Sequence, residues 1–187
     1  MKLKIIKFRT LKSTNDKAIK LIQKHRHTSG LIISDTQTKG KGTMGKKWIS
    51  KKGNIYISIF FKVDFSKFKI KNFLTINTKI LKKILKNYTT KIIKIKEPND
   101  LLIEKKKFCG ILQEVIEYEG EKFLITGIGI NTTFAPYNKF FFSTCLKEHS
   151  KKIIKNSEII RKIKNAYVQM IYDLNNNNFT YVKNKYI

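Results

Sequence analysis

Hydrophobic positions along the chain recur with two different periods, and these periods divide it into strands and helices. Alternating or β-branched apolar runs predict strands, whereas apolar residues three to four positions apart predict helices. Strands are predicted over residues 3–9, 30–35, 54–63, 91–96, 100–104, 108–118 and 122–130. Helices are predicted over 16–24, with Ser13 or Thr14 as the N-cap, over 72–87 and over 158–174, while 39–47 is predicted to be a polar loop and 175–178 to fray or turn.

The order of these elements indicates the fold class. Four strands follow one another between residues 91 and 130, and the short turns between them imply antiparallel neighbours. Helices are predicted both before and after this block. The sequence therefore predicts an α+β fold, in which a mostly antiparallel mixed sheet carries helices packed on one face.

Length and composition indicate one folded domain. A chain of 187 residues is long enough for a stable core, and 41% hydrophobic residues argue against disorder, so we expect residues 1–187 to form a single domain. No apolar run approaches the roughly 18 residues that a membrane helix needs. Cys109 and Cys145 lack metal spacing, which favours buried reduced thiols. We therefore expect a cytoplasmic protein with no membrane partner.

The formal net charge of +27 first suggests a nucleic-acid partner. However, the lysines are spread along the whole chain, and the only arginines are Arg9, Arg26 and Arg161. This distribution favours a solvated lysine coat over a dedicated nucleic-acid face. We expect no specific DNA binding, although the charge should speed encounters with acidic partners.

Two polar segments carry candidate chemistry, and the first is Gly40-Lys-Gly-Thr-Met-Gly-Lys-Lys-Trp48. Glycines let backbone amides approach an anion closely, and lysines add positive charge. The spacing is not that of a Walker loop, and a flexible solvated turn explains the loop alone equally well. Trp48, the only tryptophan, is either a core residue or a plate on which a nucleobase stacks.

The second segment begins at Lys96-Glu-Pro-Asn-Asp100 and continues into strands that contain glycine. On spacing alone, Asn-Asp after proline is ordinary turn chemistry, and Lys107 is a solvated lysine. Glycines inside strands, at 110, 127 and 129, are less ordinary because each weakens its strand. A groove that faces a ligand is the better explanation for the two at 127 and 129, and Gly110 indicates close approach by a ligand or by another backbone.

Taken in order, these motifs resemble the biotin–protein ligase family. That family's pattern runs Ser-Thr-Asn, Gly-Arg-Gly-Arg-x-Gly-Arg-x-Trp, Lys-Trp-Pro-Asn-Asp, Lys-x-x-Gly-Ile-Leu and Gly-x-Gly-x-Asn. Over roughly residues 8–175 this chain follows the pattern at 13–15, 40–48, 96–100, 107–112 and 127–131.

The resemblance implies the fold shared by biotin ligases and class II aminoacyl-tRNA synthetases, and a two-step reaction. The carboxylate of biotin attacks the α-phosphorus of ATP to give biotinyl-5′-adenylate, and a lysine of a biotin carboxyl carrier protein domain then attacks the adenylate. This chemistry needs cations around two anions, Mg²⁺ at the departing pyrophosphate and exclusion of water. A homodimer is left open.

The resemblance also implies three sets of site residues. The catalytic set is Lys107 at the carboxylate and α-phosphate, Asn99 and Asp100 at the phosphates and magnesium, with Asp100 also as base for the incoming lysine, and Lys96 in support. The ATP and adenylate set is Thr43, Gly45, Lys46, Trp48 and Asn131. The biotin set, in which Ser13, Thr14 and Gln37 would hydrogen-bond the ureido ring, is Ser13, Thr14, Asn15, Gln37, Gly40, Lys41, Gly42, Lys107, Gly110, Leu112, Gly127 and Gly129.

The chain departs from the family pattern at several positions. Lys41, Thr43 and Lys46 stand where the family has arginines, so the loop loses the bidentate guanidinium and, at Thr43, the charge itself. Glu97 stands where the family has tryptophan. The family's SH3-like C-terminal barrel and the helix-turn-helix of its repressor-type members are expected to be absent, which predicts the non-repressor type.

Three other functions stay open at this stage. A lipoate–protein ligase or octanoyltransferase would share the fold, but a lipoyl chain needs no ureido partners such as Ser13, Thr14 and Gln37. A basic nucleic-acid-binding protein without enzymatic activity would lose binding steeply with salt. A degenerate ligase would retain only adenylate binding.

Overall fold

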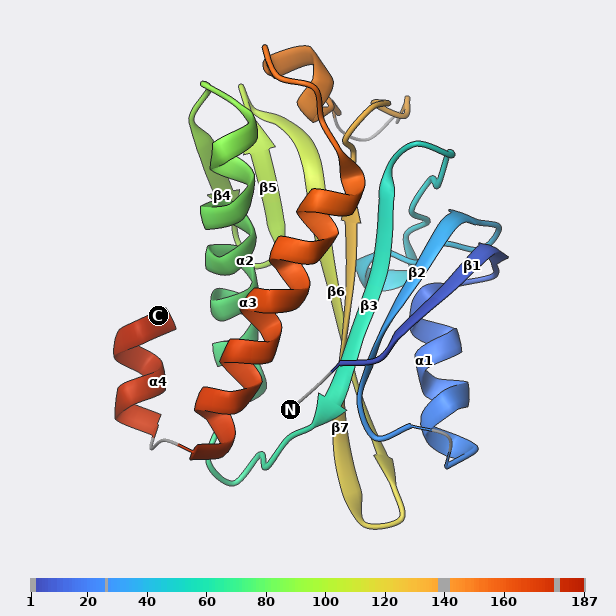
Figure 1. The fold of residues 1–187 in the computed structure, drawn as a ribbon, viewed down its shortest axis with the longest axis vertical. Coiled ribbons are helices and arrows are strands. Elements are labelled where there is room, and N and C mark those ends of the chain that lie inside the picture. Colours follow the sequence, from blue (N-terminus) through green and yellow to red (C-terminus); the bar gives the residue numbers. More distant parts are fainter. Residues whose placement is uncertain (1–2, 26, 138–141, 177–178, 187) are drawn as a thin grey trace.

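The computed structural model describes residues 3–25, 27–137, 142–176 and 179–186, and within them the chain forms one seven-stranded sheet (Figure 1). The strand order is β1-β2-β3-β7-β6-β5-β4. β1 and β2 run parallel, and all other neighbours are antiparallel. The strands are β1 (Ile5–Leu11), β2 (Gly30–Gln37), β3 (Ile55–Lys62), β4 (Ile93–Lys96), β5 (Asp100–Ile103), β6 (Lys106–Tyr118) and β7 (Glu121–Ile130). The helices are α1 (Thr14–Gln23), α2 (Ile70–Leu85), α3 (Asn156–Asn176) and α4 (Phe179–Tyr186), with 3₁₀ turns η1 (Thr43–Gly45), η2 (Lys86–Tyr88) and η3 (Leu146–His149).

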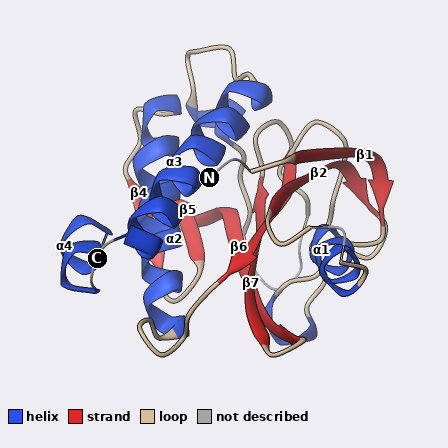
Figure 2. Cartoon of the chain, turned by 60° about the horizontal axis from the view of Figure 1, so that its bottom comes forward, coloured by secondary structure: helices blue, strands red, loops and turns tan. Residues whose placement is uncertain are grey.

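Helices lie on both faces of this sheet (Figure 2). α2 and α3 cover one face, and α1 covers the other. The central strand β3 explains the arrangement, because its two sides are both buried: Ile57 and Ile59 join the core under α2 and α3, whereas Phe60 packs with α1. The α+β class with a mixed sheet is confirmed. The prediction that helices pack on one face holds for α2 and α3 and is wrong for α1.

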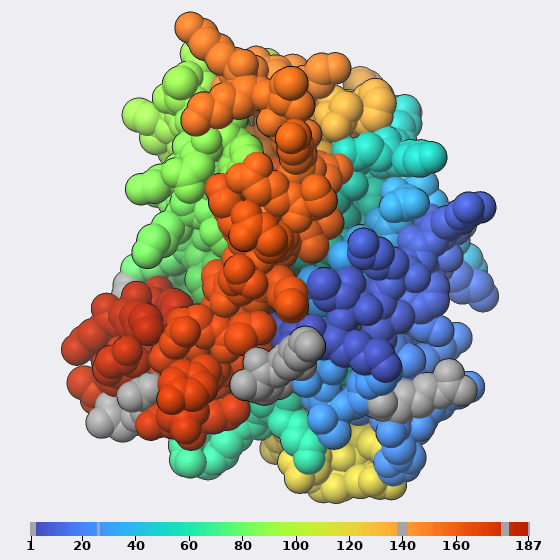
Figure 3. All heavy atoms as spheres, viewed as in Figure 1, coloured from blue at the N-terminus to red at the C-terminus, as the bar shows by residue number. Residues whose placement is uncertain are grey.

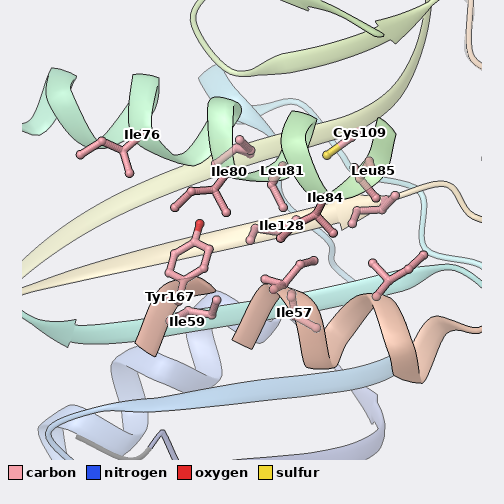
Figure 4. Close-up of a cluster of buried hydrophobic side chains, with 14 of the residues drawn as sticks. Ile57, Ile59, Ile76, Ile80, Leu81, Ile84, Leu85, Cys109, Ile128 and Tyr167 are labelled. Carbon is pink, nitrogen blue, oxygen red and sulfur yellow. The ribbon is translucent and has the colours of Figure 1, made fainter. Parts of the chain in front are cut away.

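The larger core lies between the sheet and the pair α2 and α3 (Figure 4). In the space-filling view, α3 lies over the middle of this face (Figure 3). Tyr167 of α3 is fully buried there, and its hydroxyl donates to Asn77 Oδ1 at 2.7 Å, so its polar group is satisfied. The apolar side chains that surround it include Ile57, Ile59, Ile76, Ile80, Ile84 and Ile128. Side chains therefore fill this face of the sheet.

Most of the predicted elements are confirmed within a few residues of their ends. Ser13 is the N-cap of α1 and accepts a hydrogen bond from Asp16 N at 3.3 Å. Cys109 and Cys145 are both buried and unpaired, and burial raises the pKa of the Cys109 thiol, which keeps it protonated. No helix in the described ranges is long and apolar enough to cross a bilayer.

The C-terminal helix α4 was not predicted from the sequence. Asn175 and Asn176 continue α3, so the prediction that they fray is wrong, and 177–178 lie outside the described residues. α4 is short, and it is anchored by burial of Val182 in the larger core and by one carboxylate in α3. Asp173, only 2% exposed, accepts hydrogen bonds from Lys185 Nζ at 2.8 Å and Tyr186 OH at 2.6 Å. Together with the burial of Val182 in the larger core, this polar contact between α3 and α4 fixes the helix.

Replacing Asp173 by asparagine is expected to lower the free energy of unfolding at pH 7 by about 1–3 kcal/mol, because a buried acceptor loses charge-assisted donors. Burial alone would raise the pKa of Asp173, but hydrogen bonds from Lys185, Tyr186 and Gln169 outweigh it and hold the pKa below 3.8. A lowered pKa contributes stability above the unfolded-state pKa, and this contribution disappears as pH falls. Urea titrations should therefore show the difference between the two proteins shrinking below about pH 4. Asp35→Asn, at an exposed aspartate, is the control; equal unfolding midpoints for Asp173→Asn and wild type at pH 7 would contradict the prediction.

Candidate active site

A cavity lies on the α1 side of the sheet, over the glycine-containing parts of β6 and β7. It is open to solvent, and its empty space, counted together with the solvent at its mouth, is about 460 Å³. The N-terminus of α1 and the loop after β2 supply its other walls. The residues that line it are Ser13, Thr14, Asn15, Gln37, Lys41, Gly42, Thr43, Trp48, Asn99, Lys107, Gly110, Ile111, Leu112, Gly127, Ile128 and Gly129.

This cavity brings together most of the residues that the sequence singled out, although they lie far apart along the chain. Ile111 and Ile128 were missed. Their side chains belong to the core under α2 and α3, so it is their backbone that reaches the cavity, which no side-chain pattern reveals. Among the described residues, the predicted site positions that do not line it are Gly40, Gly45, Lys46, Lys96, Asp100 and Asn131.

Three glycines form the floor of the cavity, and a side chain lies in close contact with each of them. Gly110 and Gly129 lie opposite each other in the β6–β7 ladder. A Cβ at Gly129 would lie 2.4 Å from Trp48 Cε2, and one at Gly110 would lie 2.7 Å from Trp48 Cζ3. A Cβ at Gly127 would lie 2.5 Å from Asn15 Oδ1. Larger residues are therefore excluded, because the indole of Trp48 and the amide of Asn15 lie directly on the sheet.

The Gly/Lys loop is an ordered hairpin that carries Trp48 back over the sheet. It continues β2 through an isolated bridge between Gln37 and Ser50, and Trp48 N donates to Gly40 O at 2.9 Å. At its tip, Met44 and Gly45 adopt positive φ angles of 52° and 71°. The structure thus gives this loop a defined hairpin conformation, and Lys41, Gly42, Thr43 and Trp48 of it line the cavity.

Lys107 supplies a cation beside the glycine floor. Its Nζ lies 2.6 Å from Asp100 Oδ1, and both side chains are 18% exposed. The same Nζ lies 5.3 Å from the centroid of the Trp48 ring. Partial burial strengthens the field of this ammonium group relative to that of a solvated lysine. Asp100 thus reaches the cavity through Lys107, although it does not line it itself.

A neutral polar cluster stands in another part of the cavity wall. Gln37 Oε1 accepts hydrogen bonds from Thr14 N at 2.8 Å and from Thr14 Oγ1 at 3.1 Å. The backbone N–H requires an acceptor, so it fixes the orientation of the amide, whose Nε2 donates to Ser50 Oγ at 3.1 Å. Ser50 was not among the predicted site residues. Its only sequence signal is its place two residues after Trp48.

Asn15 supports the floor and has little capacity left for a ligand. Its Nδ2 donates to Glu114 Oε2 at 2.6 Å and to Leu112 O at 3.4 Å, while its Oδ1 accepts from Ser58 Oγ at 2.5 Å. Nearly all of its hydrogen-bonding capacity is committed within the protein. Glu114 and Ser58 are therefore supporting residues that sequence reasoning missed.

Lys41 and Asp16 join the hairpin to the first turn of α1 through an ion pair. The hydrogen bond to Asp16 raises the pKa of Lys41, so the lysine stays charged. Its ammonium group is thus engaged by Asp16, while the residue itself lines the cavity.

Asn99 and Asn131 are both tied to backbone groups. Asn99 Nδ2 donates to Ile111 O at 2.7 Å. Asn131 Nδ2 donates to Thr144 O at 3.2 Å, and its Oδ1 accepts from Asn54 Nδ2 at 3.3 Å. Asn131 lines a smaller hollow next to the cavity, which it shares with Trp48 and Lys107. Trp48 and Lys107 therefore border two compartments, the cavity and this smaller hollow.

The remaining predicted residues lie away from the cavity. Gly45 and Lys46 sit at the exposed tip of the hairpin, and Lys96 is exposed on the edge strand β4. No group of three or more His, Cys, Asp or Glu side chains suited to a metal ion occurs in the described part of the chain. A divalent cation at Asp100 would therefore take most of its ligands from a bound substrate and water.

The fold and this cavity define a catalytic domain of the kind seen in biotin protein ligases. The sequence model of the Biotin/lipoate A/B protein ligase family matches residues 7–131. The chain belongs to this family.

Comparison with individual proteins gives a consistent result. The chain is 28% identical over 180 residues to the bifunctional ligase/repressor BirA of Bacillus subtilis, which covers 92% of this chain and 55% of that protein. It is 29% identical over 101 residues to BirA of Escherichia coli, covering 53% and 32%. It thus spans about half the length, or less, of these curated relatives. The biotin protein ligase of Aquifex aeolicus, solved in complex with biotin and ATP, matches with a TM-score of 0.77 and 25% identity over 97% of this chain and 76% of that one.

Proposed function

We propose that this protein is a biotin–protein ligase, which activates biotin with ATP and transfers it to a lysine of a biotin carboxyl carrier protein domain. The observation that carries the proposal is that one cavity is lined both by Lys107, whose ammonium group is paired with Asp100 behind it, and by Gln37, whose amide is oriented by Thr14. The cation suits a carboxylate and a phosphate, and the amide suits the ureido ring. Family membership and the Aquifex aeolicus structure with biotin and ATP support it.

In the activation step, an oxygen of the biotin carboxylate bonds to the α-phosphorus of ATP while the bond to the pyrophosphate oxygen breaks. Both reactants are anions, so a cation between them lowers the barrier. Lys107 is placed for this role because its ammonium group is held by Asp100 beside the glycine floor. Trp48 and Lys107 also border the smaller hollow that contains Asn131, where the adenine is proposed to bind.

Mg²⁺ would neutralise charge on the departing pyrophosphate. Asp100 is the carboxylate next to Lys107, and a single carboxylate with substrate oxygens and water is an ordinary donor set for this ion. In the transfer step, the carrier's lysine amine attacks the acyl carbon and AMP leaves. Asp100 is proposed to accept the proton of that amine.

The family also contains lipoate ligases, so the acid itself has to be tested. The amide of Gln37 favours biotin, because Ser50 takes only one of the two Nε2 N–H groups and a lipoyl or octanoyl chain would leave the other facing an apolar group; leaving a buried polar group unpaired discriminates strongly. The test is ATP–pyrophosphate exchange with biotin, lipoate and octanoate side by side. Exchange with biotin alone is expected. Exchange with lipoate or octanoate instead of biotin would replace the proposal with the lipoate reading, and no exchange at all would reject an adenylating enzyme.

Trp48→Ala is expected to weaken ATP binding by about 1–3 kcal/mol, the scale of base stacking on an aromatic ring, and to weaken biotin binding less. Trp48 borders the proposed adenine hollow, and its indole Nε1 is buried without a hydrogen-bond partner among the described residues. Calorimetry with each substrate measures the effect, and Trp48→Phe, which keeps a flat ring, should recover most of it. Unchanged nucleotide affinity, or a general fall in melting temperature, would instead show that Trp48 serves packing.

Thr43→Arg is expected to make biotinylation more selective. Thr43 lines the cavity without charge, and lysines at 41 and 46 lack the guanidinium that holds a phosphate with two hydrogen bonds. Biotinyl-adenylate should therefore escape easily from the wild type and label unrelated amines. Labelling of an unrelated lysine-rich protein, with and without carrier domain, measures this. If wild type labels only the carrier and Thr43→Arg changes nothing, another residue retains the adenylate.

The cytoplasmic location, a homodimer and the absence of specific DNA binding remain predictions. The two buried free thiols suit a reducing compartment. Sedimentation would test the assembly, and binding of labelled DNA at increasing salt would test the nucleic-acid alternative.

A further inference from the structure

Residues 142–149 lie beside the start of β6, where β7 no longer pairs with it. The last register pair of the β6–β7 ladder is Cys109 with Ile130. Beyond it, Lys107 N donates to Phe142 O at 2.9 Å, and Thr144 N donates to Lys107 O at 3.0 Å. Both backbone polar groups of Lys107 are thus bonded to a segment that lies far along the chain.

The same segment reaches Asn131, the other predicted site residue in this region. Asn131 Nδ2 donates to Thr144 O at 3.2 Å, and Leu146 N donates to Asn131 O at 2.9 Å. Thr144 therefore stands between Lys107 and Asn131 and is hydrogen-bonded through its backbone to both.

The hydroxyl of Thr144 holds this turn together. Thr144 is fully buried, and its Oγ1 lies 2.6 Å from Glu148 Oε2 and 2.7 Å from His149 Nε2. An ionised carboxylate only accepts, so the hydroxyl donates to Glu148, and His149 Nε2–H donates to the hydroxyl. The other carboxylate oxygen of Glu148 accepts from Cys145 Sγ at 3.4 Å. Glu148 is exposed, so the buried hydroxyl is the member that cannot be replaced by water.

We propose that Thr144, held by Glu148 and His149, is a positioning residue for the Lys107 ammonium group. Lys107 pairs with Leu102 of β5 on one side, and on the side that β7 leaves unpaired its backbone is bonded to residues 142–144, so a shift of Thr144 moves Nζ relative to Asp100 and to the cavity. Misplacement of a catalytic group by about 1 Å can lower a rate by about a hundredfold. The predicted effect on rate rests on the proposed function, whereas the effect on the Lys107 backbone does not.

The test uses Thr144→Val, which keeps the shape of the side chain and removes its hydroxyl. Amide hydrogen exchange is measured at Lys107, with the amide of Ile111, bonded to Asn99 O at 3.0 Å, as internal reference. Protection at Lys107 is expected to fall about tenfold, the factor that one net hydrogen bond is worth, and protection at Ile111 to stay unchanged. For biotin-dependent ATP–pyrophosphate exchange, kcat is expected to fall about tenfold, with the KM for biotin unchanged.

Three further variants separate positioning from general stability. Thr144→Ser keeps the hydroxyl and should restore both readouts, and Glu148→Gln, at an exposed position, should shift them in the same direction if Thr144→Val does not fold. Thr78→Val removes a buried hydroxyl that bonds to Leu74 O and Thr75 O within α2, far from the site, and should change neither readout.

The outcomes distinguish this proposal from the proposed function. The positioning role would be overturned if Thr144→Val kept both the amide protection at Lys107 and the kcat of the wild type. It would also be overturned if Thr78→Val lost as much kcat as Thr144→Val. The wild type could show no ATP–pyrophosphate exchange with biotin, lipoate or octanoate, while Thr144→Val still loses protection of the Lys107 amide from hydrogen exchange. In that case the positioning of Lys107 stands and the proposed function falls.

Discussion

Lys107→Ala is expected to lower the rate of biotinyl-adenylate formation by about 100- to 1,000-fold, the usual cost of removing one group that stabilises developing charge. The variant removes the ammonium group that lies beside the glycine floor, and two anions would then have to approach each other without it. ATP–pyrophosphate exchange measures the loss directly. The affinity for biotin should fall less than the rate, because the contacts proposed between biotin and the Thr14–Gln37 cluster remain.

The neighbouring lysine provides a matched control for this variant. Lys106 is exposed on the same strand and does not line the cavity, so Lys106→Ala should leave exchange unchanged. Lys107→Arg keeps a charge near Asp100 and should retain part of the activity, since its geometry differs. Near-normal exchange by Lys107→Ala would remove this residue from the mechanism. If circular dichroism shows that Lys107→Ala is unfolded, Lys107→Arg becomes the test. Full activity of Lys107→Arg would mean that the geometry of the cationic group beside Asp100 is unimportant.

Gly129→Ala is expected to have the second-largest effect, about a tenfold to hundredfold loss of exchange. A methyl group there would lie 2.4 Å from Trp48 Cε2, well inside normal contact distance, so the indole has to leave the floor. Overpacking of this kind costs about 1–3 kcal/mol, and the same displacement removes a wall from both compartments. Thermal unfolding and exchange kinetics measure the two consequences separately.

A double-mutant cycle shows whether the collision with Trp48 is the cause. In a Trp48→Ala background, Gly129→Ala should cost little additional stability, because the atoms that it meets are gone. Additive losses would mean that the new methyl group disturbs the strand itself, and the idea of a floor shaped for the indole would be abandoned. The cycle also reports how much of the cavity depends on the hairpin that carries Trp48.

The two variants test different parts of one arrangement. Lys107 tests the charge that the reaction needs, and Gly129 tests the flat surface that places Trp48 beside that charge. Both residues come from neighbouring strands, β6 and β7, whose register puts Gly110 directly opposite Gly129. An effect of Gly129→Ala on the rate without an effect on nucleotide binding would indicate that Trp48 mainly orders Lys107, from which it is separated by 5.3 Å.

Several features of this protein follow from the sequence by itself. Hydrophobic periodicity defines nearly all strands and helices, because burial of one side of a strand or helix repeats along the chain. Ser13 is identifiable as an N-cap from its place before an amphipathic helix, and glycines inside the strands at 110, 127 and 129 indicate that something approaches the sheet closely. The order of the motifs was sufficient to indicate the family.

Other features depend on contacts between distant segments, and only the tertiary structure decides them. β3 is buried on both sides, which places α1 on the face opposite α2 and α3. Asn15 is committed to Glu114 and Ser58. Asp173 and the buried Val182 hold α4 against the rest of the molecule.

The same distinction applies to the site. Local periodicity records which side of an element is buried, but not which partner buries it, since partners are set by sheet order and register. Trp48 covers the glycines because a hairpin folds back from β2. Thr144 bonds to the backbone of Lys107 because β7 ends at Ile130. The sequence by itself therefore determined the elements, the glycine positions and the family, whereas tertiary packing decided which side chains support the floor and which position the cation.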